Sequence, residues 1–212
     1  MTIEPSPSPS PGITPARPGA PRFGNRATRG IARLLLRLVG WRVEGQLPEE
    51  PRFVLIVAPH TSNWDFIIGV LAKLAVGIDA SWLGKHTIFV FPISGILRWF
   101  GGEPVDRSAS HGTVEAAIER FRARAQWVLA IAPEGTRKRV EQWKTGFYRI
   151  AVGAGVPILP VAIDYSRRVV DLGTLYHPTG DEARDLDELR RRYSARMAHH
   201  PKQFVEAGPR TA

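Results

Sequence analysis

The feature that most restricts how this chain can fold is a regular alternation of short apolar runs with helical patterns from Trp41 onward. Five apolar runs predict β-strands, at residues 53–58, 80–84, 127–132, 157–163 and 168–175. Helical patterns lie between and after them, at residues 63–76, 93–100, 113–125, 145–154 and 186–197. This alternation predicts a single α/β domain, a layered sandwich in which helices flank a mixed, largely parallel sheet.

The first 42 residues differ in composition from the rest of the chain. Residues 1–24 hold seven of the 18 prolines, interspersed with serine, which predicts a flexible tail. Residues 25–42 predict a basic amphipathic helix, with Arg26, Arg33 and Arg37 opposite the apolar side. The apolar side holds Ile31, Leu34, Leu35, Leu38 and Trp41. Two interpretations stay open: a helix packed on its own domain, or one that lies on a membrane surface.

Charge and cysteine content narrow the function classes. The chain has 29 Lys+Arg against 20 Asp+Glu, a formal net charge of +9, which favours anionic partners such as nucleic acid, phosphorylated metabolites or acidic lipid. The absence of cysteine excludes disulfides, a cysteine zinc site and a thiol nucleophile.

No apolar run reaches the roughly 18 residues that a membrane span needs. The first 30 residues lack the apolar core of a signal peptide, so we expect a protein of the cytosolic side.

The first candidate site follows the first predicted strand. His60 comes directly after it, and Asp65 falls in the first turn of the next predicted helix. Ligands and catalytic groups gather at such strand ends in α/β folds. A carboxylate beside the imidazole would fix its tautomer for general-base work. Ser62-x-x-Asp65 is also a capping pattern, and one carboxylate has enough lone pairs for both roles.

Two further loops combine glycine with cations. Arg107 follows Gly101-Gly102 and precedes a predicted helix, an arrangement that suits a phosphate. The alternative is a surface turn in which Asp106 and Arg107 form a weak ion pair. The second loop directly follows an apolar strand. It holds Glu134, Gly135, Thr136 and Arg137, with Lys144 as a further cation.

Other chemistries have less support in the sequence. There is no Gly-x-Ser-x-Gly, P-loop or Gly-x-Gly-x-x-Gly pattern. His199 and His200 are adjacent and fall on different faces of a predicted helix, so we predict no metal site.

Four motifs follow one another along the chain: His60-x-x-x-x-Asp65, residues 102–107, residues 133–137 and residues 156–162. In this order and spacing they resemble the glycerolipid acyltransferase family, in particular the 1-acyl-glycerol-3-phosphate (lysophosphatidate) acyltransferases. The resemblance covers roughly residues 50–165. It implies a glycerol-3-phosphate acyltransferase-like fold and an acyltransferase domain within residues 43–207.

The resemblance also implies roles for the site residues. His60 would be the general base that deprotonates the acceptor hydroxyl, and Asp65 would orient it. Arg107 and the loop of Glu134, Gly135, Thr136 and Arg137 would hold the acceptor phosphate, with Lys144 as a possible additional contact. The donor would be acyl-CoA or acyl-carrier protein, a co-substrate, with no cofactor needed. The product would be phosphatidic acid, made in phospholipid synthesis.

Long-chain substrates would place such an enzyme at the cytoplasmic face of a membrane, as a peripheral protein. In that case Arg26, Arg33 and Arg37 would meet anionic lipid, while the apolar side chains of Ile31, Leu34, Leu38 and Trp41 would enter the lipid surface.

Three alternatives to this function stay open. The acceptor could be another lysophospholipid or a lyso-ornithine lipid, the chain could be a basic nucleic-acid-binding protein, or it could be a lipid-binding relative without activity.

Overall fold

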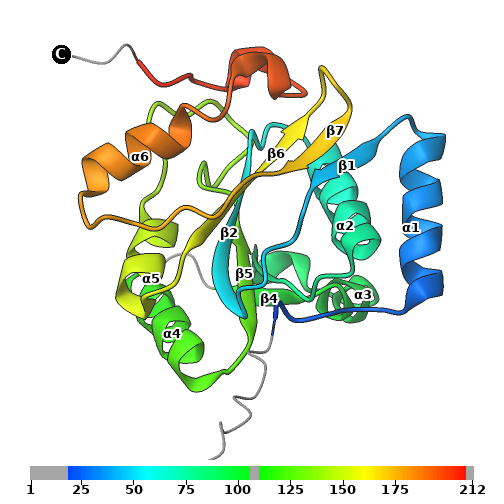
Figure 1. Ribbon diagram of the computed structural model, residues 1–212, viewed down its shortest axis with the longest axis horizontal. Helices are drawn as coiled ribbons and strands as arrows, with labels where there is room; N and C mark the ends of the chain where they lie inside the picture. The colour runs from blue at the N-terminus through cyan, green and yellow to red at the C-terminus, as the bar shows by residue number, and fades with distance from the viewer. Residues whose placement is uncertain (1–18, 106–109, 209–212) are drawn as a thin grey trace, which may run out of the picture.

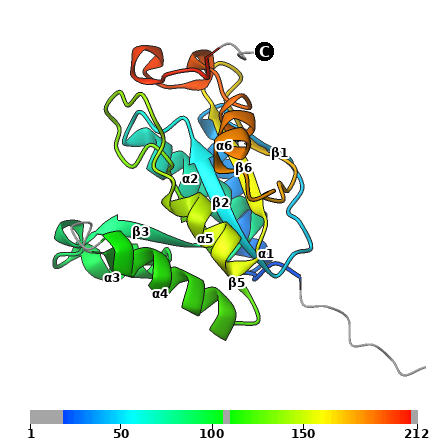
Figure 2. The same cartoon turned by 90° about the vertical axis from the view of Figure 1, so that its left-hand side faces the viewer.

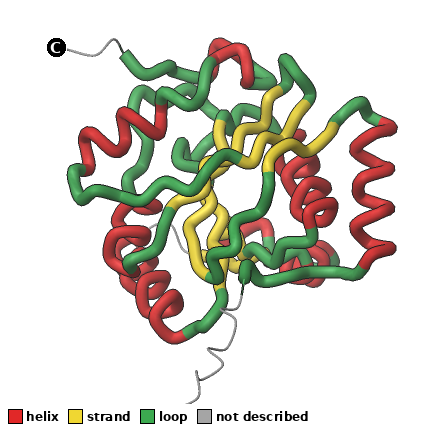
Figure 3. The backbone as a smooth tube through the Cα atoms, in the orientation of Figure 1, coloured by secondary structure: helices red, strands yellow, loops and turns green. Residues whose placement is uncertain are grey.

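The computed structural model describes residues 19–105 and 110–208, with the side chains of residues 110 and 111 left out. A central sheet separates two sets of helices, as Figures 1 and 3 show. The helices are α1 (Arg26–Leu38), α2 (Trp64–Val76), α3 (Ile93–Trp99), α4 (Ser110–Ala123), α5 (Gly146–Ala154) and α6 (Glu182–Arg190). Short 3-10 turns are η1 (His86–Ile88), η2 (Ala195–Met197) and η3 (Pro201–Gln203).

The sheet has seven strands in the order β1-β7-β6-β2-β5-β3-β4. Their bounds are β1 (Arg42–Gly45), β2 (Arg52–Ala58), β3 (Ser81–Lys85), β4 (Gly102–Val105), β5 (Trp127–Ile131), β6 (Ile158–Asp164) and β7 (Val169–Leu172). Neighbouring strands pair in parallel except β6 and β7, which are antiparallel. The predicted α/β sandwich with a mixed, largely parallel sheet is confirmed.

Strand β2 lies at the centre, paired with β5 on one side and β6 on the other. Its sequence is almost wholly apolar because both of its faces are covered, as is usual for a strand inside a parallel sheet. Val54 and Ile56 pack on the side of α4 and α5, whereas Phe53 and Leu55 pack on the side of α1 and α2. Figure 2 shows α4 and α5 side by side on their face.

Four of the predicted strands agree with β2, β3, β5 and β6 to within one residue at each end. The structure adds two strands that the sequence did not predict, β1 and β4. Both are four residues long and lie at the edges of the sheet, where Glu44 and Pro104 are tolerated because one side of the strand needs no partner. Short polar edge strands lack the apolar run on which the prediction relied.

The predicted helix at 186–197 is wrong in its bounds. Helix α6 begins after Asp181, whose side chain accepts the Arg184 N–H, and ends at Arg190. The chain then turns inward and buries Tyr193 in the core on the α5 side. His199 and His200 consequently lie between η2 and η3 and not on a helix.

The tail prediction is wrong for its last six residues, and residues 1–18 lie outside the described part. Ala20 is buried, the Phe23 N–H donates to the Gly77 carbonyl, and Arg22 bridges to Ile78. Residues 19–24 therefore pack on the domain just beyond the end of α2.

Helix α1 ends at Leu38, four residues before the predicted helix does. It packs on α2 through the buried Ala32 and Leu36, and the Arg33 Nε donates to the Ala75 carbonyl. Trp41, predicted to lie on the membrane-facing side, is instead buried in this core. Four large apolar side chains of the helix point outward, namely Ile31, Leu34, Leu35 and Leu38. Within the described ranges, no helix has both the length and the apolar character that a membrane crossing requires.

Candidate active site

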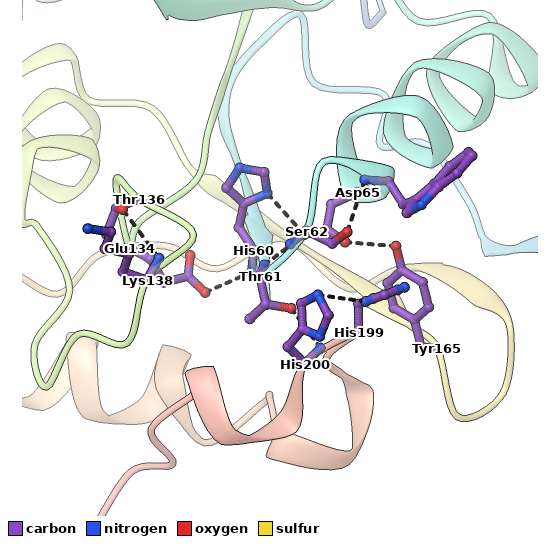
Figure 4. Close-up of polar contacts among 11 residues, drawn as sticks. His60, Thr61, Ser62, Asp65, Glu134, Thr136, Lys138, Tyr165, His199 and His200 are labelled. Atoms are coloured by element: carbon purple, nitrogen blue, oxygen red, sulfur yellow. Dashed lines mark hydrogen bonds and ion pairs between the residues drawn. The ribbon is translucent and has the colours of Figure 1, made fainter.

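The candidate site lies where β2, β5 and β6 end. These strands run parallel and adjacent, so the loops that leave their carboxyl ends meet at one edge of the sheet. His60 comes from the loop after β2, Glu134 from the loop after β5, and Tyr165 directly follows β6 (Figure 4). Two of these three loops were predicted from the sequence.

His60 and Asp65 are in contact. The His60 Nδ1 lies 3.2 Å from the Asp65 Oδ2, and the aspartate side chain is almost completely buried while the histidine side chain is 21% exposed. A carboxylate facing Nδ1 favours the tautomer with its proton there. The Nε2 atom is then left as the proton acceptor. The pair predicted from the sequence is thus assembled, while its catalytic role stays a prediction.

Asp65 also organises the loop that presents His60. Its Oδ2 accepts the backbone N–H groups of Thr61 at 2.7 Å and Ser62 at 2.8 Å, and Oδ1 accepts the Tyr165 hydroxyl at 2.8 Å. Burial would raise the pKa of Asp65, but the hydrogen bonds from His60, Ser62 and Tyr165 outweigh it and hold that pKa below its usual value. The carboxylate therefore stays ionised, and it holds the Thr61 and Ser62 N–H groups while it faces the His60 imidazole.

Glu134 holds the same loop from the other side. Its Oε1 accepts the His60 backbone N–H at 3.0 Å, and the residue is only 5% exposed. Within the described residues Oε2 has no hydrogen-bond partner. Burial raises the pKa of Glu134 above its ordinary value, although bonds from the backbone oppose the shift. Its contact in the structure is with the His60 loop, and the phosphate contact predicted for it stays a prediction.

We expect Glu134→Gln to become more stable, relative to the parent protein, as the pH rises from about 4.5 toward neutrality. A carboxyl whose pKa is raised in the folded state binds its proton more tightly there than in the unfolded chain, so ionisation destabilises the fold. Glutamine keeps an oxygen for the His60 N–H and has no proton to lose. Thermal unfolding across this pH range measures the difference.

The exposed Glu115 provides the matched control. Glu115→Gln removes a carboxyl of the same kind from the surface, so it measures the effect of losing a carboxyl that is not buried. A constant difference for Glu134→Gln would contradict the interpretation of a carboxyl destabilised by burial.

The loop after β5 carries both of its predicted cations, Arg137 and Lys144. Gly135 has a positive φ of 66°, and a Cβ there would lie 2.9 Å from the Lys144 Cδ. Glycine thus allows both the turn and the close approach of the lysine. The Thr136 hydroxyl accepts the Lys138 N–H at 3.3 Å, and Arg137 is exposed. Arg107, the other predicted phosphate ligand, lies outside the described residues.

A hollow of about 1350 Å³ opens beside these groups. His60, Arg137 and Lys144 are among the polar residues that line it. Its walls are otherwise mainly apolar, with Phe66, Val70, Trp82, Leu83 and Leu97 among the side chains from α2, β3 and α3. The arrangement places an imidazole and cations beside an apolar cavity, which suits a ligand with a polar head and a hydrocarbon chain.

Sequence reasoning missed two parts of the site. Tyr165 follows β6 directly, so the rule of strand ends that located His60 and Glu134 would have found it. The second part is the segment after α6, where the His200 N–H donates to the Thr61 Oγ1 at 3.1 Å. Gln203, with its amide turned to donate, reaches the Arg137 and Thr61 carbonyls at 2.7 and 3.0 Å. Nothing in the local sequence pointed to this contact.

Over residues 19–105 and 110–208, no group of three or more His, Cys, Asp or Glu side chains is arranged to hold a metal ion.

Known proteins resemble this chain in sequence. The family model described as "Acyltransferase" matches residues 41–164. The 1-acyl-sn-glycerol-3-phosphate acyltransferase of Escherichia coli (strain K12) is 30% identical over 155 residues, covering 68% of this chain and 61% of the relative. The protein of the same name from Haemophilus influenzae is 28% identical over 167 residues, covering 71% and 67%.

A solved structure resembles the fold. The crystal structure of the 1-acyl-sn-glycerophosphate acyltransferase from Thermotoga maritima superposes with a TM-score of 0.56 at 20% identity, over 80% of each chain. The chain spans about 60% of the length of the first curated relatives it matches. The family match takes in both the His60 loop and the Glu134 loop, which are in contact in the structure, and this chain belongs to the acyltransferase family.

Proposed function

We propose that this protein transfers a fatty acyl group from acyl-CoA or acyl-carrier protein to the free hydroxyl of 1-acyl-glycerol-3-phosphate, giving phosphatidic acid. One observation carries the proposal: a histidine oriented by a buried carboxylate faces an apolar hollow that two cations also line. The printed names of the curated relatives agree with it.

In the proposed reaction His60 is the general base. Its Nε2 takes the proton of the acceptor hydroxyl as the oxygen attacks the thioester carbonyl, and Asp65 stabilises the imidazolium through Nδ1–H. Collapse of the tetrahedral intermediate breaks the carbon–sulfur bond, and the thiolate leaves with the proton that the histidine took up. A thioester is already activated, so direct transfer needs no nucleophile from a chain without cysteine.

The acceptor phosphate is proposed to bind at the loop after β5. Arg137 and Lys144 supply charge and hydrogen-bond donors there, and Gly135 lets the lysine lie against the backbone. A charge-assisted bond to phosphate contributes about 1.5–3 kcal/mol and fixes the hydroxyl near His60. The apolar part of the hollow would take hydrocarbon, at about 0.8 kcal/mol per buried methylene.

A panel of acceptors tests the proposal. Purified protein is incubated with radiolabelled acyl-CoA or acyl-carrier protein and with 1-acyl-glycerol-3-phosphate, another lysophospholipid, or a lyso-ornithine lipid. We expect label to appear chiefly in phosphatidic acid. Transfer mainly to lyso-ornithine lipid would favour the alternative acceptor, since that lipid has no phosphate for the cations to bind.

Arg137→Ala separates these acceptors further. We expect KM for 1-acyl-glycerol-3-phosphate to rise by about tenfold or more, because the guanidinium bond to phosphate is lost, while kcat changes less. Arg139→Ala is the matched control, since Arg139 lies two residues along, is exposed and pairs with Glu141. An unchanged KM in Arg137→Ala would contradict a phosphate role for this arginine.

The acceptor and donor are proposed to be reached at the cytoplasmic face of a membrane, with the protein bound peripherally. Ile31, Leu34 and Leu38 on the outer side of α1 are 60%, 56% and 73% exposed, which is unusual for large apolar side chains on one helix. Arg26 and Arg37 are exposed on the same helix. An apolar stripe with arginines beside it suits an anionic lipid surface.

A further inference from the structure

We infer that Tyr165 is a positioning residue that holds the Asp65 carboxylate in the orientation His60 needs, an inference that rests on the proposed function. The two residues are 100 positions apart, and the tyrosine hydroxyl donates to the Asp65 Oδ1 at 2.8 Å (Figure 4). No motif of the sequence includes this tyrosine.

With this contact, each oxygen of the Asp65 carboxylate has its own set of partners. Oδ2 accepts the Thr61 and Ser62 N–H groups and lies beside His60, whereas Oδ1 accepts the Tyr165 hydroxyl. A carboxylate held at both oxygens cannot rotate about its Cβ–Cγ bond without breaking a bond on each side. Tyr165 therefore fixes the plane of the group that orients the imidazole.

The tyrosine is itself held in place. Its ring meets Trp41 edge-on with centroids 4.9 Å apart, and it meets the His199 ring edge-on at 4.8 Å. Its backbone N–H donates to the Met197 carbonyl at 2.9 Å. Trp41 is buried, so the ring has a fixed wall on one side. Two parts of the chain that are distant from Tyr165 in sequence thus set the direction of its hydroxyl.

The hydroxyl always serves as the donor in this pair. Burial, together with the hydrogen bond to Asp65 and its charge, raises the pKa of Tyr165 far above its ordinary value. The tyrosine thus keeps its proton over the whole working range, and it neither repels the carboxylate nor competes with His60 for the proton of the substrate. Its effect on the reaction comes through Asp65, since it has no described contact with His60.

Tyr165→Phe tests the inference because it removes the hydroxyl and keeps the ring. We expect kcat for acyl transfer to fall by roughly 10- to 100-fold, the loss of one hydrogen bond to a charged group, with KM for both substrates kept. The ring proton on the His60 Nδ1, observed by NMR in the full chain at neutral pH, should shift or be lost to exchange with water. This second readout needs no substrate.

Tyr148→Phe is the matched control. The Tyr148 hydroxyl also donates at 2.8 Å to a buried aspartate, Asp185, but this pair joins α5 to α6 and does not touch the His60 loop. Both variants lose the same kind of bond, so we expect similar losses in melting temperature. Only Tyr165→Phe should change kcat and the His60 ring proton.

The outcomes separate this inference from the proposed function. Parent-like kcat and an unchanged ring proton in Tyr165→Phe would overturn the inference, as would equal losses of kcat in both variants. A parent protein that acylates none of the acceptors would overturn the proposed function, and the ring proton would then decide alone whether Tyr165 positions the pair.

Discussion

Replacing His60 by alanine is expected to lower kcat for acyl transfer by about 10²- to 10⁴-fold, the contribution of a positioned general base. The side chain is 21% exposed and faces the hollow, so its loss leaves no large cavity in the core. Asp65 keeps its bonds from Thr61, Ser62 and Tyr165. We therefore expect the variant to fold and to bind both substrates with KM near that of the parent. Steady-state kinetics with 1-acyl-glycerol-3-phosphate measure the effect.

His177→Ala is the matched control for this experiment, because His177 is an exposed histidine in the segment between β7 and α6. It should turn over like the parent. Circular dichroism and thermal unfolding of both variants establish that the fold is kept. A His60→Ala protein that acylates at the rate of the parent would remove the base from the proposed reaction and with it the interpretation of the His60–Asp65 pair.

The double variant Leu34→Glu/Leu38→Glu is expected to weaken binding to anionic vesicles by about a hundredfold or more. Burying a leucine contributes about 1.5–3 kcal/mol, two are removed, and the new carboxylates are repelled by the lipid. Both side chains are more than half exposed, so the fold should be unaffected. Co-sedimentation with phosphatidylglycerol vesicles, and with phosphatidylcholine vesicles for comparison, measures the change.

Substitution is a better test than removal of α1, because the helix buries Ala32 and Leu36 against α2. Val152→Glu is the control, since Val152 is 46% exposed on α5, across the sheet from α1. It should bind vesicles like the parent protein. If the α1 double variant also sediments like the parent, this face of α1 does not bind the membrane.

Much of the fold could be predicted from local patterns. The β2 run from Phe53 to Ala58 is apolar on both faces and Gly77 ends α2 in a left-handed conformation, so strand and helix bounds there are encoded within a few residues. The His60–Asp65 contact was also predictable. Both residues lie on one loop and the helix turn that follows it, so no distant part of the chain is needed to bring them together.

The rest of the site depends on which strands become neighbours. Glu134 reaches His60, and Tyr165 reaches Asp65, only because β5 and β6 pair with β2 on its two sides. The sequence showed three separate strand ends. It did not show that the residues after β5 and β6 would form hydrogen bonds with the segment that follows β2.

Helix α1 shows most clearly what the sequence determined and what only the tertiary structure decided. The sequence by itself determined that this segment is an amphipathic helix with leucines at helical spacing, because that property depends only on local periodicity. The tertiary structure decided which side faces the protein: Ala32 and Leu36 pack on α2, the other leucines stay outside, and Trp41 turns inward to Tyr165. Periodicity specifies a helix face, whereas the surface that covers this face is formed only when distant segments have folded around it.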